Sequence, residues 1–221
     1  MEIKKCHCGV RGIIAAVIML SVFVIDQIIK VAVKTNMCLY ESIEVTDWFH
    51  IYFIENRGMA FGMDFFATSF LSLFRIIAIV IFLYLLLKII RNKYPIGLIA
   101  CLSLVVAGAM GNIIDNCCYG MIFTESTPLQ VASNVSWGEG YGGVMSGKVV
   151  DMFYFPLFTW PDWVPVLGGD VFFGAVFNFA DAAISCGAVG ILLFYHKYLI
   201  GTKERQKDSN EEMTDTFSEG K

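Results

Sequence analysis

Residues 177–194, FNFADAAISCGAVGILLF, form an apolar run with helical character that is long enough to be heading across a membrane. The run nevertheless carries Asn178 and Asp181 near its start. A carboxylate at the centre of a membrane helix costs about 2.5–3.5 kcal/mol on insertion scales. Because no basic residue lies within one helical turn of Asp181, its position requires a functional explanation.

The composition of the whole chain is that of a membrane protein. Of its 221 residues, 57% are hydrophobic and only 16% are charged, and the mean hydropathy is +0.65. A soluble domain of this length carries more charge. Basic stripes with interleaved aromatic residues are missing from the sequence, so we expect no nucleic-acid partner. The seven dispersed cysteines do not follow the pattern of a disulfide framework, and we expect no metal site.

Four segments have the length and apolar character of membrane-spanning helices, at about residues 12–33, 70–90, 96–118 and 171–198. The first follows a basic N-terminus without a small-x-small cleavage site behind it, which indicates an uncleaved helix. We therefore expect an all-α membrane protein, residues 1–200, with a small extracytoplasmic β and loop region. Residues 201–221 are expected to form a charged, disordered cytoplasmic tail.

The distribution of basic residues predicts the orientation of these helices. Lys and Arg gather before the first span, in the short loop 91–95 and after the fourth span, whereas the two long loops hold few. The positive-inside rule then places both termini in the cytoplasm and all four tryptophans outside. The aromatic run MFYFPLFTWPDW, residues 152–163, is too short to span, and we expect it to lie along the outer interface.

Three of the predicted helices carry an aspartate at similar depth. With a rise of 1.5 Å per residue, Asp26, Asp115 and Asp181 lie about 21, 28 and 26 Å from the inner face. Asp151 is expected just outside the membrane, at the end of the second long loop. The carboxylates thus collect near one face of the membrane.

Helical spacing links these aspartates to other polar residues. Asn112 precedes Asp115 by three residues, and Asn178 precedes Asp181 by three, so each pair shares a helix face. Lys30 follows Asp26 by four residues, which is the favourable order for an ion pair on one helix. Polar contacts between packed helices are one explanation for all of these residues. That explanation fits Asp26, with its Lys30 partner, better than it fits Asp181.

Carboxylates that face one another at the outer membrane surface also suggest acid–base chemistry. Two close carboxyl groups share a proton near neutral pH, so one can activate water while the other polarises a carbonyl. This is the chemistry of an aspartic protease. The alternative is a small proton-coupled transporter or relay protein, because intramembrane aspartates also mark ion pathways. The inner halves of the predicted spans lack acidic residues, which argues against a transport file across the membrane.

The sequence resembles the lipoprotein signal peptidase (signal peptidase II) family, which are four-helix aspartic proteases of the bacterial inner membrane. The resemblance runs through most of the chain, in the family's order. The matching segments are VIDQIIK at 24–30, ENRGMAFG at 55–62, AGAMGNIIDN at 107–116, KVVDMFYF at 148–155 and FNFADAAISCG at 177–187.

This resemblance implies roles for individual residues. The catalytic pair would be Asp151 and Asp181. Substrate-binding and supporting roles would fall to Asp26, Lys30, Asn56, Gly58, Asn112, Asp115 and Asn178. The implied substrates are precursor lipoproteins whose cysteine bears diacylglycerol, cut before that cysteine at the outer face of the membrane. The resemblance implies no cofactor, and we expect a monomer in contact with membrane lipids.

Two features depart from the family's pattern. Asn116 stands where the family commonly has Arg, so an ion pair between that Arg and Asp115 is lost. Residues 119–147 form a long insertion before the segment that carries Asp151. The insertion is either an extra outer lid or a solvated loop.

Overall fold

The computed structural model of the chain describes residues 2–56 and 65–198. Its long helices are α1 (Glu2–Asn36), α2 (Phe65–Arg91), α3 (Ile96–Ile114) and α5 (Phe179–Gly190). Four described stretches are long and apolar enough to cross a membrane: Gly9–Asn36, Leu73–Arg91, Ile96–Ile122 and Phe179–Tyr198. Four apolar helices are therefore present where the sequence predicted them, although their ends differ.

The largest difference concerns the fourth span, which begins at Phe179 and not at residue 171. Strands β5 (Val171–Phe172) and β6 (Val176–Phe177) occupy the residues before it. The helix begins here because Asn178 caps it, since its side chain accepts a hydrogen bond from the Asp181 N–H. At its C-terminal end, α5 continues into the π-helix η2 (Ile191–Tyr195). Helices α1 and α2 begin earlier than predicted, at Glu2 and Phe65.

Helix α3 lies at the centre of the bundle and packs most extensively against α5 and α1, whereas α2 packs mainly against α3. Small residues permit the closest contact. A Cβ atom on Gly108 would lie 2.3 Å from the Ala180 carbonyl oxygen, and one on Gly187 would lie 2.4 Å from that of Cys101. Glycine at both positions therefore lets the backbones of α3 and α5 approach closely.

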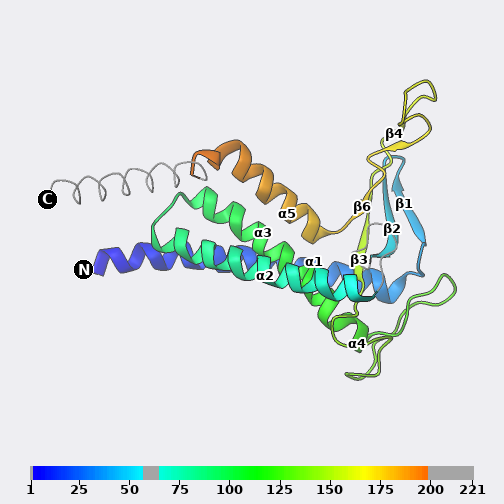
Figure 1. Cartoon of the computed structure of the whole chain (residues 1–221), viewed down its shortest axis with the longest axis horizontal. Helices are drawn as coiled ribbons and strands as arrows, with labels where there is room; N and C mark the ends of the chain where they lie inside the picture. Colours follow the sequence, from blue (N-terminus) through cyan, green and yellow to red (C-terminus); the bar gives the residue numbers. More distant parts are fainter. Residues whose placement is uncertain (1, 57–64, 199–221) are drawn as a thin grey trace, which may run out of the picture.

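An antiparallel sheet stands across one end of the bundle, at the end of α1 opposite the N-terminus (Figure 1). Its strand order is β1 (Ser42–Thr46), β2 (Phe49–Asn56), β3 (Val149–Tyr154), β6. Phe53, Val150 and Met152 from this sheet pack into one core with Val33 and Tyr119 from the helices. The expected small β and loop region is thus an organised sheet that shares its core with the bundle.

The aromatic run 152–163 is divided between two strands, and its expected position at the membrane interface stays a prediction. It starts within β3 and continues into β4 (Phe158–Thr159), which pairs with β5. The resulting hairpin projects from the edge of the sheet (Figure 1), and Trp163 in its turn is 81% exposed. Aromatic residues are common in strands. The pairing of β4 with β5, which makes this segment a strand, was not apparent in the sequence.

The insertion 119–147 is folded onto the C-terminal part of α3 and is not a solvated loop. The helix continues through the π-helix η1 (Asp115–Tyr119) and the short α4 (Gly120–Ile122). The chain then returns, so that the N–H groups of Gly138 and Gly140 both donate to the Met121 carbonyl. Phe123, Ser126 and Ala132 are buried.

Candidate active site

Asp151 lies in the middle of β3. The sequence suggested a different position for it, at the end of the second long loop. It is paired with Ile54 of β2 in the sheet and is only 3% exposed. Asn178 donates a hydrogen bond from Nδ2 to Asp151 Oδ1 over 2.6 Å, and the Asn56 side chain is also hydrogen-bonded to Asp151. The strand and two amides therefore hold this carboxyl group in one position.

Asp181 lies in the first turn of α5, on the same local framework. Its N–H donates to Asn178 Oδ1 over 2.9 Å, and the Asn178 N–H donates to Asp181 Oδ2 over 3.3 Å. This reciprocal capping box keeps the carboxylate at the start of the helix. Asn112 Nδ2 of α3 donates to Asp181 Oδ1 over 2.8 Å. Asn178 thus contacts both Asp151 and Asp181.

The electrostatic environment favours the protonated form of Asp151. Burial, followed by the negative charge of Asp181, raises the pKa of Asp151 to about 7. The hydrogen bond from Asn178 and the charge of Lys30 act in the opposite direction. At neutral pH this carboxyl group is therefore close to half-protonated, as a group that both gives and takes a proton must be.

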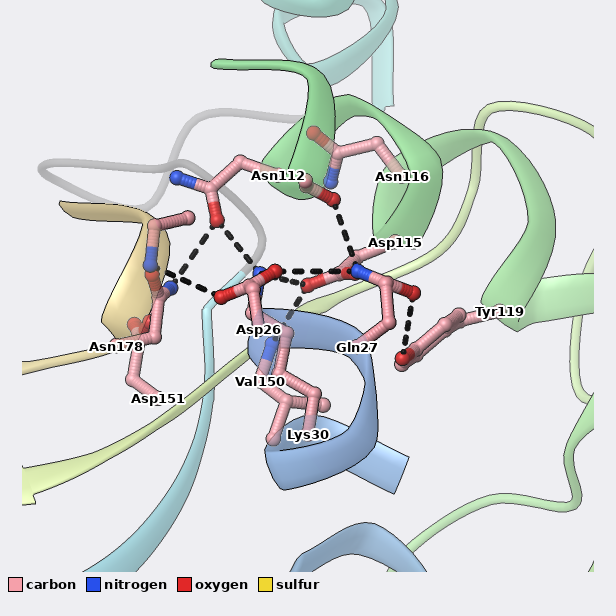
Figure 2. A network of polar contacts seen from close by, with 12 residues as sticks. Asp26, Gln27, Lys30, Asn112, Asp115, Asn116, Tyr119, Val150, Asp151 and Asn178 are labelled. Atoms are coloured by element: carbon pink, nitrogen blue, oxygen red, sulfur yellow. Dashed lines mark hydrogen bonds and ion pairs between the residues drawn. The ribbon is translucent and has the colours of Figure 1, made fainter. Parts of the chain in front are cut away.

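Lys30 of α1 connects Asp26, on the same helix, with Asp115 at the end of α3 (Figure 2). Its ammonium group lies 3.0 Å from Asp26 Oδ2 and 2.8 Å from Asp115 Oδ2, and it donates to Asn112 Oδ1 over 2.8 Å. The side chain is fully buried, so all three ammonium donors are used within the protein. Asp115 is thus held by Lys30. It therefore keeps a cationic partner although position 116 is Asn and not Arg.

Asp26 connects α1 to the start of α5. Its Oδ1 accepts a hydrogen bond from the Ala180 N–H over 2.9 Å. This N–H belongs to the first turn of α5, where a negative charge is favourable. A Cβ atom on Gly111 would lie 2.5 Å from Asp26 Oδ2, so only glycine leaves room for the carboxylate at this point of α3.

Two residues of the network were not anticipated from the sequence. Gln27 Nε2 donates to Asp115 Oδ1 over 3.0 Å, and the Tyr119 hydroxyl donates to Gln27 Oε1 over 3.1 Å. Gln27 could have been found as a second polar residue beside Asp26 in an apolar span. Tyr119 could not, because it becomes internal where the π-helix η1 turns Asp115, Asn116 and Tyr119 all inward. Single π turns of this kind are frequent at functional sites.

The structure brings together most of the residues proposed from the sequence. Those that meet in one polar network are Asp26, Lys30, Asn112, Asp115, Asp151, Asn178 and Asp181. Asn56 reaches this network through Asp151. Gly58 lies outside the described residues.

Comparison with known proteins finds relatives that match most of the chain. A model of the family described as Signal peptidase (SPase) II matches residues 18–197. The lipoprotein signal peptidase of Porphyromonas gingivalis is 46% identical over 190 residues, which cover 84% of this chain and 84% of that protein. The lipoprotein signal peptidase of Chlorobium luteolum is 33% identical over 190 residues, covering 84% and 94%.

A solved structure shares the fold. It is that of a bacterial membrane enzyme determined by the in meso method at 1.9 Å, with a TM-score of 0.54 and 24% identity. The match covers 81% of this chain and 90% of that chain.

Proposed function

The chain belongs to the signal peptidase II family, and from this premise we propose that Asp151 and Asp181 form its catalytic dyad. The protein is a membrane aspartic peptidase that removes the signal peptides of lipoproteins. The observation that carries the assignment of the dyad is Asn178, whose side chain and backbone contact both carboxyl groups. The raised pKa of Asp151 supports it.

In the proposed mechanism the two aspartates hold one proton between them. The ionised carboxylate takes a proton from a water molecule, and the oxygen of that water attacks the carbon of the scissile carbonyl. The protonated carboxyl donates its proton to the carbonyl oxygen, which gives a neutral tetrahedral diol. Collapse of the diol breaks the C–N bond, with one proton returning to a carboxylate and one passing to the leaving amine.

The amides and the lysine keep this pair in place during the reaction. Asn178 holds Asp151, and Asn112 holds Asp181 through short hydrogen bonds. Lys30 donates to the Asn112 oxygen and thereby orients its NH₂ group towards Asp181. None of these steps requires a cofactor.

The substrates proposed are precursor lipoproteins whose cysteine carries diacylglycerol, cut before that cysteine. The dyad lies where the helices meet the sheet (Figure 1), which suits a lipid-bearing cysteine held at a membrane surface. We place the protein in a bacterial inner membrane with both termini in the cytoplasm and the dyad at the outer face. The distribution of basic residues supports this orientation. The comparisons give no support to a transporter.

The test is cleavage by the purified protein in detergent of a precursor peptide with and without the diacylglyceryl group. Only the modified peptide should be cut before the cysteine. Asp151→Asn and Asp181→Asn should each lower turnover by about 10³-fold or more, and the double variant should be little worse, because the pair acts as a unit. Asp170→Asn, at an exposed aspartate near β5, is the matched control and should cleave normally. Near-normal turnover by Asp151→Asn would exclude this dyad.

A further inference from the structure

Helix α2 carries a charged side chain, Arg75, in its outer part, at the end of an apolar stretch. Arg75 lies about 24 Å along the helix axis from Arg91 at the inner end, close to the depth predicted for Asp181. Its side chain is half-buried. An ionisable residue in a membrane span is costly and usually has a defined partner.

The partner of Arg75 is an amide on the neighbouring helix. Arg75 Nη1 donates to Asn116 Oδ1 over 2.7 Å. Asn116 is fully buried, and its Nδ2 donates to the Gly147 carbonyl over 2.9 Å, while the Gly147 N–H returns a bond to the Asn116 carbonyl. The amide is therefore locked to the segment that leads into β3, with its oxygen directed at α2. An arginine whose role was only to bind lipid headgroups would not need a buried amide held in place to accept its hydrogen bond.

The charges around Arg75 point to the dyad. Its guanidinium interacts electrostatically with Asp181 and Asp151, and among the described residues no carboxylate lies close enough to form an ion pair with it. Lys30, the other cation that acts on Asp151, is already shared between Asp26 and Asp115. Among the described residues, the charged side chains near the pair are thus Arg75 and Lys30, with Asp26 and Asp115 paired to Lys30, and the neutral amides are Asn56, Asn112 and Asn178.

We propose that Arg75, held by Asn116, is a positioning residue of the peptidase whose positive charge keeps one carboxylate of the Asp151–Asp181 dyad ionised at neutral pH. The inference rests on the proposed dyad. The family commonly has an arginine at position 116, where this chain has Asn116. In this chain the guanidinium comes from Arg75 of α2, which donates a hydrogen bond to Asn116.

The pH profile of kcat/KM on the diacylglyceryl-modified peptide tests this proposal. Loss of the positive charge makes both carboxyl groups of the pair harder to ionise, so Arg75→Gln should move the whole profile, acidic and alkaline limbs alike, up by about one pH unit. At a pH on the acidic limb its activity should therefore fall by about 10-fold. Arg75→Lys, which keeps the charge, should retain most of the wild-type profile. Lys88→Gln, at an exposed lysine far along the same helix, is the matched control.

Each outcome has a defined meaning. A uniform loss of activity by Arg75→Gln, without a shifted limb, would make Arg75 a structural residue and overturn the proposal. A wild-type profile would also overturn it. If Asp151→Asn is inactive in the same assay, the dyad stands even when the Arg75 proposal fails. If Asp151→Asn is active, both fail.

An exchange variant supplies a second test, in which the hydrogen bond between positions 75 and 116 is kept. Arg75→Asn combined with Asn116→Arg swaps the guanidinium and the amide across the same hydrogen bond. The exchange should recover the acidic limb that Arg75→Asn alone displaces, provided that both proteins unfold at similar temperatures in detergent. An exchange variant that is folded but keeps the displaced limb would refute the assignment of the charge to this contact.

Discussion

Asp151 lies where its charged form is disfavoured, and this has a consequence for stability. Burial and the charge of Asp181 raise its pKa to about 7, whereas an aspartate in the unfolded chain has a pKa of about 3.9. Between about pH 4 and pH 7 the folded state therefore binds more protons than the unfolded state. The contribution of Asp151 to the free energy of unfolding falls as the pH rises through this window, and its cost is largest above pH 7.

We expect Asp151→Asn to stabilise the protein while it abolishes cleavage. Asparagine keeps the shape of the side chain without the charge, so the gain should be on the order of 4 kcal/mol at pH 8 and near zero at pH 4. Thermal unfolding in detergent at several pH values measures this difference. Asp170→Asn, at an exposed aspartate, should show no pH-dependent difference. A gain for Asp151→Asn that is equal at pH 4 and pH 8 would contradict the argument.

Asp26 should matter for stability more than for chemistry. Its carboxylate pairs with Lys30 and accepts the Ala180 N–H at the start of α5. Asp26→Asn would leave Lys30 with Asp115 alone and weaken the cap, at a cost of about 3 kcal/mol. We predict a lower unfolding temperature in detergent with partial cleavage activity. Unchanged stability together with abolished cleavage would instead give Asp26 a direct part in the reaction.

Single residues were predictable where depth and spacing carried the information. The aspartates and asparagines were found because a polar group in an apolar helix is expensive, and because i,i+3 spacing puts pairs on one face. Gln27, Tyr119 and Arg75 were missed. Their roles depend on which helices are neighbours and on the π turn at Asp115–Tyr119, and neither follows from periodicity within one helix.

At the scale of elements, the insertion is tied to the sheet by buried charges. Ser126 accepts a hydrogen bond from Lys34 Nζ over 2.9 Å and donates to Glu55 Oε1 over 2.8 Å. Lys34 also forms an ion pair with Glu55, and Lys148 lies 3.1 Å from Glu55 Oε2. Burial alone would raise the pKa of Glu55, but the adjacent Lys34 outweighs it and holds the pKa below its usual value. Glu55 is followed by Asn56, which contacts Asp151.

These contacts indicate that residues 125–140 contribute to the stability of the fold. Deletion of 125–140 would take away Ser126 and the buried Ala132. We expect the shortened protein to unfold at a clearly lower temperature in detergent and to cleave poorly. Leu129→Ser, at a residue that is 95% exposed, is the control. A shortened protein with wild-type stability would show that the insertion is dispensable.

A helix or strand was predictable when the residues within it determine it, and was not when it depends on a partner far away in the sequence. The four spans follow from apolar length, which each segment carries in its own residues. The start of α5 at Phe179 needed the capping box of Asn178 and Asp181 to be recognised. Strand β3 could not be predicted, because its pairing with β2 joins residues about 100 positions apart and strand propensity depends on such neighbours.

For the whole molecule, the four long helices are not equally closely packed against one another. Helices α1, α3 and α5 form the closely packed core of the bundle, and α2 is attached mainly through α3. The buried network of Lys30, Asp26 and Asp115 joins α1 to α3, and Asp26 joins α1 to α5. Arg75 connects α2 to the same polar centre. All four membrane helices thus contribute to one site at the end of the bundle that carries the sheet.

The orientation of the molecule in its membrane is the last prediction. Lys88, Arg91 and Lys93 lie around the turn between α2 and α3, at the end of the bundle opposite the sheet. The positive-inside rule places this turn in the cytoplasm and the sheet, with the dyad, outside. In a background without the seven natural cysteines, Trp163→Cys in the hairpin should react with a membrane-impermeant maleimide in intact spheroplasts. Asn92→Cys, also at an exposed position, should react only after permeabilisation. The reverse labelling pattern would put the dyad on the cytoplasmic side, where a precursor held at the outer surface could not reach it.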